Sequence, residues 1–71
     1  MLIKQFGQAI KKRRKDLGIT QPILAELADV SINTLYKLER AQGNPSLVII
    51  EKLVSVLGIE IILEVKANIK K

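Results

Sequence analysis

The sequence predicts a mainly helical domain of four short helices, followed by a single β-strand near the carboxyl end. Three observations predict this fold class. Apolar residues recur three, four and seven positions apart as far as Leu57, which is the spacing of a helical face. Good helix-capping residues, Thr20 and Ser31, begin two segments of that stretch, and a loop signal precedes a third segment that begins at Ser46. After Gly58 the pattern changes to alternating apolar and charged residues, the period of a strand.

The composition limits how such a domain can be stabilised. The chain has 71 residues and contains neither cysteine nor histidine. A single core of this size is only marginally stable unless a disulfide, a metal or a partner supports it. Disulfides and the usual zinc sites are excluded, so we expect a second copy of the chain to add stability. We expect no cofactor, no metal and no enzymatic activity, because no convergent set of catalytic side chains can be assembled.

The charge narrows the class of partner. Lys and Arg number 12 against 7 Asp and Glu, a formal net charge of +5, which favours a nucleic acid or an anionic membrane. No apolar run approaches the roughly 20 residues of a spanning helix, and the first basic cluster follows the apolar residues, the reverse of a secretory signal. The capping and turn residues suit a folded bundle better than a helix lying on a membrane. We expect a soluble, cytoplasmic protein.

The first predicted helix ends at Gly18, which can adopt the left-handed conformation that closes a helix, with Ile19 packing back onto it. The five cations Lys11–Lys15 lie in its last turns. Such a run is either a solvated face or part of a binding surface, and both interpretations stay open. Because five consecutive residues wrap most of the way round a helix, at least one of them points inward or sideways. The predicted buried stripe comprises Ile3, Phe6, Ile10 and Leu17.

A sharp turn joins the second and third predicted helices. The second begins at Thr20, and Pro22 is tolerated in its first turn because the N–H that proline lacks would be unpaired there anyway. The turn at residues 28–30 needs a positive φ, which Asp29 tolerates better than most residues other than glycine. The third helix runs from its N-cap, Ser31, to about Arg40. The residues predicted to point inward from these two helices are Ile23, Leu24, Leu27, Leu35 and Leu38.

Gly43 and the Asn44-Pro45 pair then predict a loop before the fourth helix, which runs from Ser46 to about Leu57. This helix is more apolar than one buried face requires, so we expect part of it to face a second subunit. Its inward residues are predicted to be Leu47, Ile50, Leu53, Val54 and Leu57. The remaining apolar residues are Val48, Ile49 and Val56.

Residues 59–66 are predicted to form a strand because apolar and charged side chains alternate there, with only Ile62 out of place. A single strand cannot satisfy its own backbone, and no other stretch has a strand pattern. We therefore expect antiparallel pairing with the same strand of a second copy; the alternative is a short fifth helix docked on the core. Residues 67–71 form a basic tail. The predicted dimerisation residues are Ile59, Ile61, Ile62, Leu63 and Val65.

The stretch from Ile10 to Gly58 resembles the Cro and repressor type of helix-turn-helix regulator, often called the Xre family. The resemblance implies a lambda-repressor-like DNA-binding domain of four helices over residues 1–58. Asp29 and Ala41 depart from the family pattern, because both stand where it usually has glycine. The residues that carry the resemblance are Thr20-Gln21, Leu24-Ala25, Ser31, Glu39 and Asn44-Pro45-Ser46.

The resemblance also implies roles for individual residues. Arg14 and Glu39 occupy positions that form an internal salt bridge in the family, where Gln21 also supports the recognition helix. The first residues of a recognition helix meet base edges in the major groove, so we predict that Ile32, Asn33 and Thr34 read bases, with Asn33 suited to adenine. Tyr36 is predicted to contact phosphate or base; the alternative is packing against the first or second helix. Predicted backbone contacts are Thr20, Gln21, Lys37, Arg40, Gln42, Gly43 and Asn44.

A four-helix domain that ends in a strand is similar to HipB-like antitoxins. That similarity implies a repressor that controls its own toxin-antitoxin operon and a HipA-like toxin kinase as a possible partner. The function predicted from the sequence is therefore a homodimeric, sequence-specific repressor that binds a near-palindromic operator in double-stranded DNA and so resides on the nucleoid. The alternatives are a protein-interaction module that mainly neutralises a toxin kinase, and a phage-type or restriction-control regulator.

Overall fold

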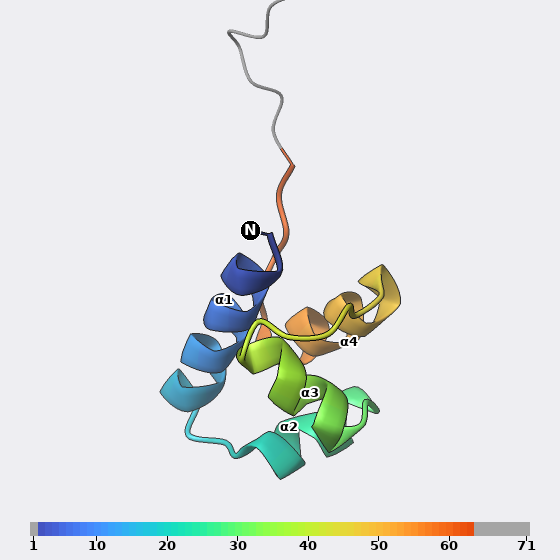
Figure 1. The fold of residues 1–71 in the computed structure, drawn as a ribbon. Helices are drawn as coiled ribbons and strands as arrows, with labels where there is room; N and C mark the ends of the chain where they lie inside the picture. Colours follow the sequence, from blue (N-terminus) through green and yellow to red (C-terminus); the bar gives the residue numbers. More distant parts are fainter. Residues whose placement is uncertain (1, 64–71) are drawn as a thin grey trace, which may run out of the picture.

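The computed structural model describes residues 2–63, which form four helices (Figure 1). Their bounds are Leu2–Asp16 for α1, Gln21–Ala28 for α2, Ile32–Glu39 for α3 and Leu47–Leu57 for α4. The predicted four-helix fold is confirmed. Thr20, Ser31 and Ser46 cap the starts of α2, α3 and α4, because each side-chain oxygen accepts a hydrogen bond from the backbone N–H three residues later. None of these helices has the length and apolar character needed to cross a membrane.

The hydrophobic core lies where the four helices meet. α1 and α2 each pack against both α3 and α4. Every helix contributes at least one side chain that is 99% or more buried, and burying one such side chain stabilises a fold by about 1.5–3 kcal/mol. These side chains are Ile10 from α1, Leu24 from α2, Leu35 and Leu38 from α3, and Leu53 and Leu57 from α4. The α3 helix is therefore held against the core along one side.

Two residues at helix ends were wrongly predicted to point inward. Leu17 follows the last residue of α1, leaves the helical stripe and is 45% exposed. Leu47 is the first residue of α4 and is 73% exposed, because it lies one turn before Ile50 and beyond the edge of the core. Helical spacing predicts which residues share a face, but it does not predict where the core ends.

The inward prediction was also wrong for Ile23 and Leu27 in α2, which are 46% and 61% exposed. The buried side of this helix consists of Leu24 with the small residues Ala25 and Ala28. Small side chains let a helix approach its neighbours closely, and the two larger side chains then fall on the outer side. The exposed pair leaves an apolar strip along the outside of α2.

Each helix closes with a residue in the left-handed region, followed by a residue whose N–H bonds the carbonyl five positions earlier. Gly18 closes α1 as predicted, and Gly58 closes α4. Asp29 closes α2 at φ 57°, also as predicted, and Ala41 closes α3 at φ 59°. The two departures from the family pattern thus occupy positions that suit glycine, since L residues adopt this conformation at a cost of about 1–2 kcal/mol.

Replacing Ala41 with glycine is therefore expected to raise the free energy of unfolding by about 1 kcal/mol. The substitution removes the strain of an alanine in the left-handed conformation, and this strain is larger than the extra chain entropy that a glycine loses on folding. Asp29→Gly is expected to gain less, since aspartate tolerates this region better than alanine. Urea denaturation checks both values. The matched control is Ala9→Gly in the exposed middle of α1, which should lose about 1 kcal/mol. A loss of stability in Ala41→Gly would contradict this account of the turn.

The predicted carboxyl-terminal strand is not formed over residues 59–63. Ile59 packs against the core and donates its N–H to Val54 O at 2.9 Å, while Ile62 and Leu63 are 70% and 92% exposed. The segment leaves the helices as a coil (Figure 1). A strand needs a partner strand for its backbone groups, and no described segment of this chain supplies one. The fifth helix is not formed in these residues either; residues 64–71, including Val65, lie outside the described residues.

Candidate nucleic-acid interface

The start of α3 is fixed by a local hydrogen-bond pair. Ser31 Oγ accepts the backbone N–H of Thr34 at 3.0 Å and donates to Thr34 Oγ1 at 2.7 Å. The side chain of Thr34 is thereby held in place and is half-buried. Ile32 is 47% exposed and Asn33 is exposed beside it. The three residues predicted to read bases therefore stand at the open first turn, where unpaired N–H groups make the helix end partly positive.

One side of α3 is buried against the core and the other side is exposed; we call the exposed side the open face. Leu35 and Leu38 are fully buried, whereas Tyr36, Lys37 and Arg40 are exposed. The open face continues from the first turn to the end of the helix and carries cations but no acidic side chain. This surface could accept an anionic ligand along its whole length.

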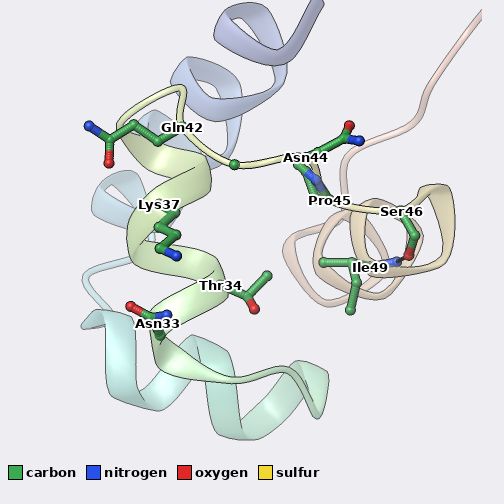
Figure 2. Close-up of a pocket in the computed structure, with 9 residues that line it drawn as sticks. Asn33, Thr34, Lys37, Gln42, Asn44, Pro45, Ser46 and Ile49 are labelled. Carbon is green, nitrogen blue, oxygen red and sulfur yellow. Dashed lines mark hydrogen bonds between the residues drawn. The ribbon is translucent and has the colours of Figure 1, made fainter.

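A groove of about 330 Å³ runs beside this open face (Figure 2). Side chains from α3 form one wall, and the loop after α3 with the first turn of α4 forms the other. The lining residues are Asn33, Thr34, Lys37, Gln42, Gly43, Asn44, Pro45, Ser46 and Ile49. Six of them were predicted to contact DNA. Pro45, Ser46 and Ile49 were not, because only the folded chain brings the start of α4 opposite α3.

The other predicted contact residues lie outside the groove. Thr20 Oγ1 caps α2 by accepting the N–H of Ile23 at 3.4 Å. Gln21 is half-buried and directed at α3. Tyr36 and Arg40 lie together, with the guanidinium carbon 5.2 Å from the ring centroid. The Tyr36 side chain is 46% exposed and does not belong to the buried core.

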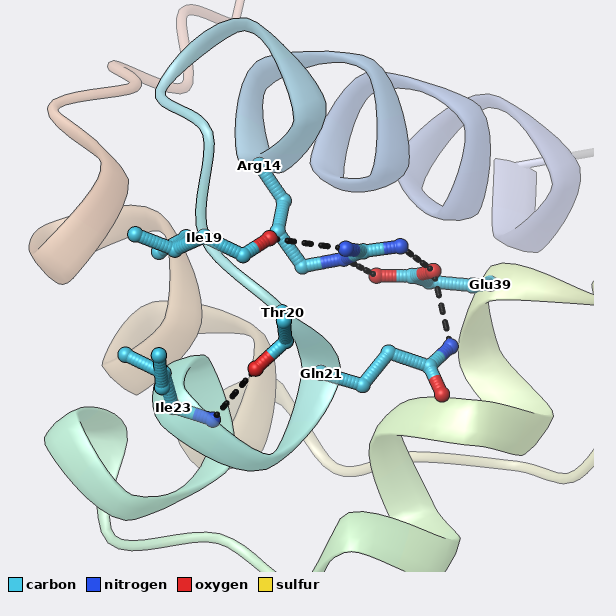
Figure 3. A network of polar contacts seen from close by, with 6 residues as sticks. All are labelled: Arg14, Ile19, Thr20, Gln21, Ile23 and Glu39. Atoms are coloured by element: carbon cyan, nitrogen blue, oxygen red, sulfur yellow. Dashed lines mark hydrogen bonds and ion pairs between the residues drawn. The ribbon is translucent and has the colours of Figure 1, made fainter.

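A buried ion pair joins α1 to the end of α3 (Figure 3). Arg14 Nε donates to Glu39 Oε2 at 2.8 Å, and Arg14 Nη2 donates to Oε1 at 3.0 Å. The two side chains are only 10% and 2% exposed. Arg14 Nη1 also donates to Ile19 O at 2.9 Å. The hydrogen bond to Glu39 outweighs the effect of burial and raises the pKa of Arg14, so the guanidinium stays charged.

Gln21 extends this pair to α2. Its Nε2 donates to Glu39 Oε1 at 3.0 Å, so the first residue of α2 is tied to the last residue of α3 (Figure 3). Three helices thus meet at one carboxylate. Because hydrogen bonds to a charged group are stronger than those between neutral groups, this network fixes the angle at which α3 is presented.

Gly7 and Arg13 support α3 and its surroundings through contacts with residues far away in the sequence. Gly7 is buried in α1, and a Cβ at this position would overlap the carbonyl oxygen of Leu38. The α1 and α3 backbones are therefore in direct contact. Arg13, one of the five cations at residues 11–15, has a structural role, because its Nε donates to Leu57 O at 2.9 Å and caps the end of α4. For the contact between Gly7 and Leu38, the sequence signal is a glycine in the interior of a helix.

Two short helices joined by a tight turn, the second open along its outer face, make this a helix-turn-helix protein. The family model described as HTH_3, Helix-turn-helix, matches residues 10–63. The chain belongs to this family. The resemblance to Xre-type helix-turn-helix regulators is confirmed at that level, whereas the narrower resemblance to HipB-like antitoxins stays a prediction.

Several relatives are similar over most of this chain. The immunity repressor protein of Bacillus phage phi105 is 44% identical over 55 residues, which cover 78% of this chain and 38% of the repressor. An uncharacterized HTH-type transcriptional regulator of Methanothermobacter thermautotrophicus is 39% identical over 51 residues, 72% of this chain and 74% of the relative. The crystal structure of the restriction-modification controller protein C.AhdI from Aeromonas hydrophila matches with a TM-score of 0.75 and 38% identity, over 82% of this chain and 88% of the controller.

Proposed function

We propose that this protein is a transcriptional repressor that binds a specific sequence in double-stranded DNA through α3. The observation that carries the proposal is the open face of α3, whose first turn presents Ile32, Asn33 and Thr34. The opposite face of α3 is buried against the core. A helix of this kind fits the major groove, and its first residues meet base edges. The net charge of +5 and the repressor and controller names of the relatives support the same function.

In this proposal the groove beside α3 follows one strand of the DNA backbone. Lys37 would neutralise a phosphate, and the polar side chains of Gln42 and Asn44 would donate to neighbouring phosphates. Asn33 would read an adenine by a bidentate hydrogen bond, and Ile32 would meet a thymine methyl group. Thr20 and Gln21, at the start of α2, would approach the backbone on the other side of the recognition helix.

Two variants separate the reading of bases from the neutralisation of phosphates. Asn33→Ala is expected to weaken binding to the preferred duplex by roughly 5- to 150-fold while leaving random duplex unchanged, which corresponds to about 1–3 kcal/mol for one base contact. Lys37→Ala is expected to weaken both duplexes equally and to reduce the salt slope by about one. Fluorescence anisotropy at several salt concentrations measures both effects. Equal losses on both duplexes for Asn33→Ala would show that it reads no base.

We further propose that the protein binds as a homodimer, so that two α3 helices enter successive major grooves about 34 Å apart on a near-palindromic operator. The apolar side chains left exposed, among them Val48, Ile62 and Leu63, are candidates for the contact between copies. Light scattering tests this: we expect the mass of two chains, and a lower proportion of dimer after removal of residues 59–71. An unchanged dimer in the shortened chain would exclude this segment from the interface.

The relatives bear on the kind of operon this repressor controls. The names immunity repressor and restriction-modification controller support a phage-type or restriction-control regulator as much as an antitoxin. The antitoxin prediction requires a HipA-like kinase that binds this chain. Expression together with the product of the neighbouring gene tests it, because a stable complex with a kinase would support the antitoxin role and a neighbouring restriction enzyme or phage gene would oppose it.

A further inference from the structure

Tyr36 and Arg40 form a pair on the open face of α3 that is separate from the groove. They lie one helical turn apart, and the Arg40 guanidinium carbon is 5.2 Å from the centre of the Tyr36 ring. This distance is within the range of a cation–π contact. The ring is 46% exposed, so its position is not explained by packing in the core. One face of the ring instead supports the guanidinium.

The main chain of Arg40 is fixed, whereas the N–H groups of its guanidinium have no hydrogen-bond partner among the described residues. Its backbone N–H donates to Lys37 O at 3.1 Å, and the chain turns at the next residue, Ala41, with φ 59°. Within residues 2–63, the Arg40 side chain forms no ion pair and donates no hydrogen bond. Arg13 and Arg14 differ in this respect, because both of their guanidinium groups donate to protein oxygens. Arg40 is thus held by a ring and available to an anion.

We infer that Tyr36 is a positioning residue, whose ring holds the Arg40 guanidinium ready to bind a phosphate of the DNA backbone. The inference rests on the proposed function and deepens it. The guanidinium carbon lies over the Tyr36 ring, and its N–H groups form no hydrogen bond within residues 2–63, so they can donate to a phosphate, whose geometry they match. Arg40 lies about two turns beyond Asn33, at the end of α3 away from the base-reading end. This placement favours the backbone over a base edge.

The size of the effect follows from the exposure of the pair. A cation–π contact at an exposed site corresponds to about a two- to five-fold change in an equilibrium constant. The Tyr36 ring strengthens binding because it limits the orientations of the Arg40 side chain before DNA binds. Less conformational entropy is then lost when the side chain contacts the phosphate. Tyr36→Leu is therefore expected to weaken DNA binding about two- to five-fold. Tyr36→Phe, which keeps the ring and loses only the hydroxyl, is expected to bind as the parent does.

A double-mutant cycle on the full chain tests the inference. Duplex DNA selected by the parent protein is titrated with Tyr36→Leu, Arg40→Ala and the double variant at several salt concentrations. Arg40→Ala is expected to lower the salt slope by about one, and adding Tyr36→Leu to it is expected to cause no further loss. In the absence of DNA, NMR should show ring-current shifts of the Arg40 side-chain protons that Tyr36→Phe retains and Tyr36→Leu abolishes. Unchanged thermal midpoints would show that the variants fold.

Three results would overturn the positioning role while leaving the proposed function intact. The first is an equal loss from Tyr36→Leu with and without Arg40, since the ring would then contact DNA itself. The second is a loss in Tyr36→Phe as large as that in Tyr36→Leu, which would assign the contact to the hydroxyl. The third is no loss in Tyr36→Leu. Failure of the parent protein to bind any duplex would instead overturn the proposed function, and the positioning role with it.

Discussion

Glu39→Ala is expected to lower the free energy of unfolding by about 3–5 kcal/mol, one of the two largest effects we predict for a single substitution. Removing one partner of a buried ion pair leaves the other charge without compensation. Here the Arg14 guanidinium would lose both of its bonds to the carboxylate, and the Gln21 amide would lose its acceptor. Urea denaturation followed by circular dichroism measures the loss. Small domains have only about 5–15 kcal/mol in total, so a large part of the fold's stability depends on this one carboxylate.

Two further variants separate this explanation from a general effect of charge. Arg14→Met combined with Glu39→Leu removes both charges and fills the space with apolar atoms, so it should cost less than Glu39→Ala alone. Lys12→Ala breaks the exposed pair with Asp16, whose side chains are 78% and 51% exposed, and should change stability by less than about 0.5 kcal/mol. If the double variant lost as much free energy of unfolding as Arg14→Met and Glu39→Leu lose when their separate losses are added, the account of the buried pair would be contradicted.

Gly7→Ala is expected to be the other strongly destabilising substitution, with a loss of roughly 2–4 kcal/mol. Helix propensity alone predicts the opposite, a gain of about 1 kcal/mol from alanine within a helix. The packing dominates because the new Cβ would overlap the Leu38 carbonyl oxygen, and a backbone atom cannot move aside as a flexible side chain can. α1 and α3 would have to separate, which would also tilt the recognition helix and weaken DNA binding.

The neighbouring position supplies a control for Gly7→Ala. Gln8→Ala places the same side chain on the exposed side of α1 and should change stability by less than about 0.5 kcal/mol. Thermal unfolding of the two variants and the parent gives the comparison. Gly7→Ala with a stability equal to or above that of the parent would show that the two helices are not in backbone contact.

The parts of the fold that depend on local chemistry were predictable from the sequence. Thr20, Ser31 and Ser46 marked the starts of three helices because a capping side chain acts on the backbone three residues away. Asp29 was expected to have positive φ because a tight turn between two helices requires it. The exposure of Ile32 and Asn33 followed from their place in the first turn of α3, and their reading of bases stays a prediction.

The parts that depend on distant residues were not predictable from local patterns. The partner of Arg14 lies 25 positions away, and family resemblance, not spacing, suggested Glu39. The meaning of Gly7 depends on the helix that crosses it, and Ser46 lines the groove only because α4 folds back beside α3. The alternating pattern from Ile59 onward is typical of a strand, but a strand requires a partner strand, and residues 59–63 form no strand in the single chain. The spacing of apolar residues predicts which side chains share one face of a helix or strand, but contacts with distant residues determine whether that face is buried.

The central claim is that α3 reads a specific sequence in double-stranded DNA. The most direct test selects duplexes from a random pool with the full chain, then compares its affinity for the selected duplex with that for a shuffled duplex of the same composition at the same salt concentration. We predict that the selected duplex binds about 1,000-fold tighter or more, as specific DNA-binding proteins do. Equal affinity for the selected and shuffled duplexes would contradict the claim, because binding would then come from charge alone.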